Sequence, residues 1–130
     1  MKLSVKSNIM DCRVGWCRFV SAENECLSTR SHKHRFYELH YVTQGELCFL
    51  FQDERVLHVN HSQFIIIPAD MMHDIFNQQK TTVKLVIGFE ITDGQPSVTS
   101  SLRATQSLNV WQASAALKRL ANALMEKKQL

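Results

Sequence analysis

Residues 32–45 read HKHRFYELHYVTQG, and they are the part of the sequence from which the fold is most readily predicted. His32, His34 and Glu38 share parity, so in an extended chain the two imidazoles and the carboxylate project from one face. Gly45 follows at a point where a turn between two strands is expected. The pattern predicts a strand that carries a polar cluster on one side and ends in a turn.

The surrounding sequence is a series of short β-type segments separated by turn-forming residues such as Gln44-Gly45 and Pro68-Ala69-Asp70. No helical periodicity interrupts the series. Short strands at this even, close spacing predict an antiparallel sandwich or barrel. The expected strands are 13–20, 36–43, 46–52, 55–59, 63–67, 73–76 and 83–89.

His73 begins one of these segments, just beyond the strand that ends at Pro68. In a closed barrel a neighbouring strand can bring this third imidazole beside the first two. Three imidazoles and a carboxylate suit a divalent transition metal (Zn, Fe, Mn or Ni) and leave open positions for substrate or water. The sequence therefore predicts that His32, His34, Glu38 and His73 either ligate a metal or form a hydrogen-bonding lining for a small effector without one.

The spacing resembles the two motifs of the cupin superfamily. His32, His34, Glu38 and Gly45 match Gly-x5-His-x-His-x(3,4)-Glu-x6-Gly, although Cys26 occupies the leading glycine position. The second motif is Gly-x5-Pro-x-Gly-x2-His-x3-Asn, and Pro68, His73 and Asn77 match it, with Ser62 and Asp70 at its glycines. Ser and Asp are acceptable turn residues. The resemblance implies an all-β fold: a small cupin (double-stranded β-helix, jelly-roll) barrel.

Within these motifs, residues 34–46 resemble the His-x-Phe-Tyr-Glu-Leu-x-Tyr-Val-x-x-Gly signature of AraC-type sensor domains. Residues 57–68 and 85–91 continue the resemblance, which covers about residues 13 to 125. It implies an effector-binding and dimerisation domain of a transcription regulator, which reaches DNA through a helix-turn-helix domain that this chain lacks. The expected effector is a small polar metabolite, bound by His32, His34, Glu38, His40 and His73.

The carboxy-terminal part has a different pattern. After a barrel over 1–96 and a linker over 97–110, an amphipathic helix is expected from about Trp111 to Lys128, within a helical segment 111–130. The stripe Ala113, Leu117, Leu120 and Leu124 predicts a homodimer interface, as helices do in the resembled family. Packing of the stripe on the outside of its own barrel is the alternative.

A second function is a free-standing, metal-dependent cupin enzyme, an isomerase or dioxygenase. No nucleophile or second positioned acid accompanies Glu38, so unaided acid-base catalysis is not expected and no catalytic residue is assigned. His40 is expected to line the pocket rather than to ligate a metal. His58 and His61, near a turn, are expected to be exposed.

Composition is that of an ordinary domain: 130 residues, 45% hydrophobic and 21% charged. The charge of +3 is spread along the chain, so direct contact of this segment with nucleic acid is not expected. No apolar run approaches the roughly 20 residues that span a bilayer, and no secretory signal opens the chain, so a cytoplasmic location is expected. The four cysteines are accordingly expected to be reduced.

Overall fold

The computed structural model describes residues 3–6, 10–23, 29–32, 35–76, 81–94 and 108–129. These residues form ten strands and one helix, α2 (Ala115–Gln129). The strands are β1 (Leu3–Lys6), β2 (Met10–Glu23), β3 (Thr29–His32), β4 (Tyr37–Gln44), β5 (Glu46–Phe51), β6 (Val56–Asn60), β7 (Gln63–Ile67), β8 (His73–Phe76), β9 (Thr81–Gly94) and β10 (Val110–Gln112).

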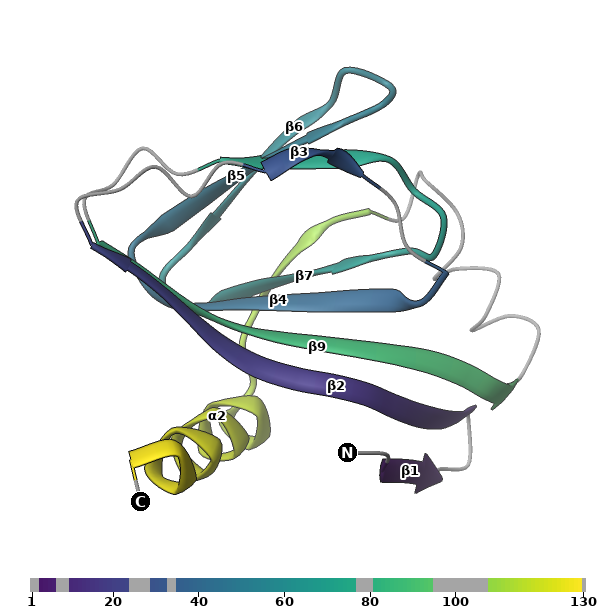
Figure 1. Ribbon diagram of the computed structural model, residues 1–130, viewed down its shortest axis with the longest axis vertical. Coiled ribbons are helices and arrows are strands. Elements are labelled where there is room, and N and C mark those ends of the chain that lie inside the picture. Colours follow the sequence, from purple (N-terminus) through teal and green to yellow (C-terminus); the bar gives the residue numbers. More distant parts are fainter. Residues whose placement is uncertain are drawn as a thin grey trace.

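The strands make two antiparallel sheets that face each other (Figure 1). One has the order β1-β2-β9-β4-β7-β10 and the other has the order β3-β8-β5-β6. Apolar side chains from both inner faces fill the space between the sheets, as expected for packed sheets. This core comprises Val42, Leu47, Phe49, Phe51, Val59, Ile65, Ile67, Ile75 and Leu108. The predicted all-β architecture is confirmed.

Each of the seven expected segments contains a strand, with ends shifted by a few residues. The largest differences lie in β2 and β9, which extend well beyond 13–20 and 83–89 and pair along most of their lengths. The short strands β1, β3 and β10 were not predicted. Each has only three or four residues, too few to show an alternating pattern.

Turns at the motif positions require a left-handed backbone. Gly45 has φ 84°, and a Cβ there would lie 2.4 Å from the Thr81 carbonyl oxygen, so only glycine fits. Ser62 and Asp70, which stand at glycine positions of the second motif, have φ 68° and 62°. These two positions therefore keep the left-handed backbone conformation although they are not glycine, because polar turn residues tolerate it.

The helix begins at Ala115 rather than at Trp111. Val110, Trp111 and Gln112 instead form β10, which pairs with β7, and the Ala113 amide donates to the Ser62 carbonyl oxygen at 2.8 Å. Ser114 caps the helix, because its Oγ accepts from the Leu117 amide at 3.2 Å. Val110 is β-branched and Trp111 is aromatic, and both residue types favour strands, which accounts for the later start of the helix.

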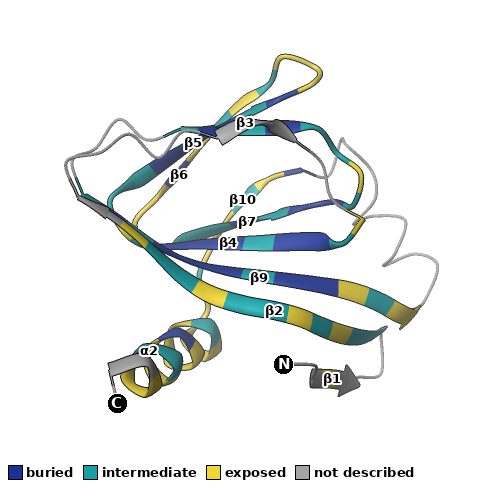
Figure 2. Ribbon diagram, in the orientation of Figure 1, coloured by how far each residue is buried: buried dark blue, intermediate teal, exposed yellow. Residues whose placement is uncertain are grey.

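Helix α2 lies on the outer face of the larger sheet, as Figures 1 and 2 show. Ala121 is 1% exposed there, and Leu117, Leu124 and Ala113 pack against the same cluster, which includes Tyr41 and Leu85. Leu120 lies off this contact and is 46% exposed. Three members of the predicted stripe thus contact the chain's own barrel, and one faces solvent.

Within the described residues, Cys12, Cys17 and Cys48 are free thiols, as expected, while Cys26 lies outside them. Burial raises the pKa of all three thiols. No helix in the described part of the chain has the length and apolar character to cross a membrane.

Candidate functional site

The polar cluster is built by strand register on the inner face of the larger sheet. Glu38 and His40 on β4 lie opposite Gly88 and Val86 of β9 and opposite Ile67 and Ile65 of β7. Because alternate residues of a strand face opposite sides, the intervening Leu39 and Tyr41 face the helix instead. A single strand therefore supplies both the polar site inside and part of the helix contact outside.

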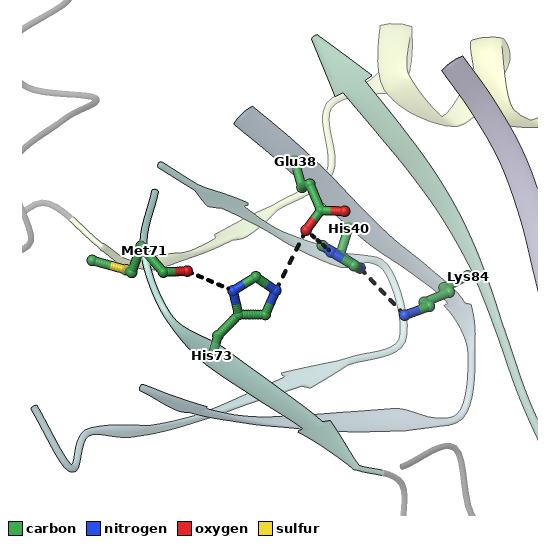
Figure 3. Close-up of polar contacts among 5 residues, drawn as sticks. All are labelled: Glu38, His40, Met71, His73 and Lys84. Atoms are coloured by element: carbon green, nitrogen blue, oxygen red, sulfur yellow. Dashed lines mark hydrogen bonds and ion pairs between the residues drawn. The ribbon is translucent and has the colours of Figure 1, made fainter. Parts of the chain in front are cut away.

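Glu38, His40 and His73 meet in the barrel interior (Figure 3). Glu38 Oε1 lies 3.4 Å from His73 Nε2 and 3.6 Å from His40 Nε2. The exposed fractions are 4% for Glu38, 2% for His40 and 1% for His73. Strands β4 and β8, from different sheets, thus bring a carboxylate and two imidazoles together in a nearly dry environment.

His73 is oriented by the loop that precedes β8. Its Nδ1 donates to the Met71 carbonyl oxygen at 2.8 Å, and a carbonyl can only accept, so the proton lies on Nδ1. In the neutral ring the lone pair is then on Nε2, which faces Glu38 Oε1. A proton or a bound cation between these two atoms makes the contact attractive.

Lys84 of β9 completes the cluster and was not predicted from the sequence. Its Nζ donates to His40 Nδ1 at 3.4 Å, and its exposed fraction is 6%. Neutral His40 then carries its proton on Nε2, directed at Glu38. The sequence does contain a signal for it, because Lys84 is the single charged residue in the otherwise apolar strand segment 83–87. A lysine is rarely buried at such a position without a partner, so a buried partner for Lys84 could have been predicted.

Burial controls the charges of this cluster. Desolvation lowers the pKa of His40 to about 4, with the Lys84 charge adding to the effect and Glu38 opposing it, so the ring is neutral at pH 7. Desolvation also lowers the pKa of Lys84 to about 8, against the attraction of Glu38. At neutral pH the His40 ring is therefore neutral, and Lys84 keeps its ammonium charge although its pKa is lowered.

Two predicted site residues are described only in part or not at all. The backbone of His32, on β3, pairs with His73 of β8, which brings the first motif beside the second. His34 lies outside the described residues, as does Asn77 of the second motif. His58 and His61 are exposed, as expected.

The described residues fit a metal ion in part. Glu38 Oε1 lies 3.4 Å from His73 Nε2, and His73 donates its other ring N–H to a carbonyl oxygen, as metal-ligating histidines do. His40 does not fit, because its Nδ1 accepts a hydrogen bond from the Lys84 ammonium and its Nε2 carries the ring proton. Among the described residues no group of three or more His, Cys, Asp or Glu is arranged to hold a metal, and His34 is not among them.

A cavity of about 440 Å³ adjoins this cluster through the loop that holds His73. Phe51, Pro68, Asp70 and Met71 are among the residues that line it. The Phe51 ring, which lines the cavity, lies 6.4 Å from the His73 ring, centroid to centroid, whereas His73 itself does not line the cavity. The Met71 carbonyl oxygen that orients His73 belongs to this same lining residue.

Comparison with known proteins gave a family and several similar folds. The model of the family described as AraC-like ligand binding domain matches residues 19–129. The protein YhaK from Escherichia coli has a TM-score of 0.55 at 5% identity, over 88% of this chain and 52% of YhaK. A cupin superfamily protein from Desulfitobacterium hafniense has a TM-score of 0.49 at 18% identity, over 69% and 76%. Comparison with curated proteins gave no match.

Proposed function

The chain belongs to the AraC-like ligand binding domain family, and we propose that it senses a small polar metabolite inside its barrel for a transcription regulator. His32, His34, Glu38, His40 and His73 are the proposed contacts. The observation that carries the proposal is the buried polar cluster of Glu38, His40, His73 and Lys84. A barrel that needed only stability would fill this position with apolar side chains, because buried polar groups are costly.

The cavity beside the polar cluster also supports ligand binding. The cavity of about 440 Å³ lies in the size range of small-molecule sites, and it combines apolar walls with a few polar groups. His73 is linked both to this cavity, through Met71, and to Glu38. A ligand that displaced the loop at Met71 would therefore change the contacts of the cluster.

A bound divalent metal is part of this proposal, with His32, His34, Glu38 and His73 as its ligands. When present, it would supply a Lewis acid for a ligand oxygen. Glu38 would bring negative charge to the site, and His73 would be held by the Met71 carbonyl oxygen with Nε2 available. The His32 backbone, paired with His73, is compatible with this arrangement.

Pairing of two chains is also proposed, through the exposed part of the helical segment. Leu120 is 46% exposed on α2, and Trp111 is 51% exposed at the sheet edge. Leu120→Glu should shift a dimer to monomer in sedimentation equilibrium, while Asn122→Glu, at an exposed position about half a turn away on the same helix, should not. A dimer that persists in Leu120→Glu, or dissociates in both variants, contradicts this interface.

A thermal-shift screen with sugars, organic acids and amines tests the sensing function. Saturation at about 100 Kd stabilises a protein by about 2.7 kcal/mol, so at least one compound should raise Tm by several degrees. His40→Gln should weaken that binding at least tenfold. His58→Gln is the matched control, because His58 is exposed and lies outside the cluster.

The results of this screen distinguish the sensor from a metal-dependent enzyme. Equal affinity in both variants would place binding outside the cluster and contradict the proposal. No stabilising compound, together with metal-dependent turnover of a screened compound, would favour the enzyme.

A further inference from the structure

The inner face of the larger sheet continues beyond the polar cluster onto β2. Trp16 of β2 lies opposite Gly88 of β9, and Arg18 lies opposite Val86. Gly88 and Val86 are also the partners of Glu38 and His40 on β4. Directly paired residues share a face, so Trp16 and Arg18 face the same side as Glu38 and His40.

An aromatic wall forms at this end of the inner face. A Cβ on Gly88 would lie 2.4 Å from the Trp16 indole, so the ring lies directly on the glycine backbone. Phe36 packs edge-on to Trp16 with ring centroids 5.6 Å apart. Trp16, Phe36 and Gly88 line a mainly apolar cavity of about 130 Å³, at whose rim Glu90 lies 4.0 Å from Arg13.

A cation stands beside this wall. The Arg18 guanidinium lies over the Trp16 ring at 5.1 Å from its centroid, and the side chain is exposed. Within the described ranges, Arg18 has no ion pair with a carboxylate. It is close enough to Lys84 that its charge contributes to lowering the pKa of that buried ammonium.

Charge on the inner face is therefore unbalanced, because Arg13 and Glu90 offset each other and the remaining charges do not. Arg18 and Lys84 contribute two positive charges, and Glu38 contributes the negative charge that attracts Lys84. A ligand with a carboxylate would relieve the repulsion between the two cations, whereas an amine would increase it. The guanidinium is suited to carboxylates because its planar donors match the two oxygens.

We propose that the effector is an organic carboxylate whose anionic group pairs with Arg18, with Lys84 adding attraction from deeper in the barrel. Its apolar body lies on Trp16 and Phe36. This inference rests on the proposed sensing function and names the chemical class of the ligand.

The fluorescence of Trp16 reports on binding directly. The chain has two tryptophans, so Trp111→Phe leaves Trp16 as the single reporter. In that background we would titrate benzoate and octanoate, each against its amide. At least one carboxylate should change the emission saturably, and its amide should bind at least tenfold more weakly.

Variants locate the anionic group. Arg18→Gln should weaken carboxylate binding at least tenfold, and Arg18→Lys should recover part of it, because the positive charge returns without the planar fork. Arg119→Gln, an exposed arginine on α2, should bind like the parent. Circular dichroism of each variant checks that the barrel is folded.

Three results would overturn the inference: equal binding of the amide, no response to either carboxylate, or unchanged affinity in folded Arg18→Gln. The sensing function is tested separately. If a neutral sugar or an amine stabilises the protein in a His40-dependent manner while carboxylates do not bind, the proposed sensing function is supported and the proposed carboxylate class is wrong.

Discussion

Replacing Lys84 with methionine should change how stability depends on pH. The pKa of Lys84 is lowered from 10.5 to about 8 in the folded protein, mainly by desolvation. Between these values the unfolded chain binds more protons than the folded chain, so stability attributable to Lys84 rises with pH. At about 1.36 kcal/mol per pH unit, the shift of the Lys84 pKa raises the free energy of unfolding by about 3 kcal/mol in total. About 2.5 kcal/mol of this increase is reached by pH 10.

Urea unfolding at several pH values from 7 to 10 measures this effect. The useful quantity is the unfolding free energy of the wild type minus that of Lys84→Met, which should increase by about 2 to 3 kcal/mol over the range. Cysteine thiols with raised pKa values lower stability as pH rises through 9, but they are common to both proteins and cancel. The exposed Lys118→Met serves as the control.

A difference that stays constant within about 0.5 kcal/mol from pH 7 to 10 would refute the reasoning. Such a result would mean that Lys84 does not lose its hydration in the folded protein, and that the ammonium is not held against His40 as the structure has it.

Three further predictions concern single residues. The pKa of His40 is lowered from 6.5 to about 4, so wild-type stability should fall by up to about 3 kcal/mol as pH drops through this range, and urea unfolding of His40→Phe should show a smaller loss. Gly45→Ala should cost about 2 to 4 kcal/mol, whereas Gly15→Ala, whose Cβ would meet Gly88 at an ordinary 3.7 Å, should cost less; equal urea midpoints would contradict the steric argument. Ser114→Ala should lower stability by about 1 kcal/mol through loss of the helix cap, and an unchanged melting curve would exclude that role.

The fold was predictable because its signals are local. Strand segments show in alternation and turn chemistry, and both depend on neighbours within a few residues. Ser62 and Asp70 are examples, since these turn-forming residue types predicted turns at positions where the backbone φ is positive. The helix start was wrong because Ala113 contacts the same cluster as Leu117 and so continues the helical stripe although it precedes the helix.

The candidate site was predictable only where the residues share a motif. Glu38 and His73 meet as expected, and they do so from different sheets. Lys84 was missed because its partner His40 is forty-four positions away in the chain, and no spacing rule connects them. Arg18 and Trp16 were missed for the same reason, since the β2–β9 register alone puts them on the inner face.

Local sequence patterns were enough to predict the β-rich barrel, its turns and the polar residues of the cupin motif. These depend on short-range backbone preferences and on a repeat of two residues. Tertiary structure decided which charges meet inside the barrel, which tautomer each imidazole adopts, and that Leu117 and Leu124 pack on their own barrel while Leu120 does not. Those outcomes depend on strand register and desolvation, which arise only when distant segments pack together.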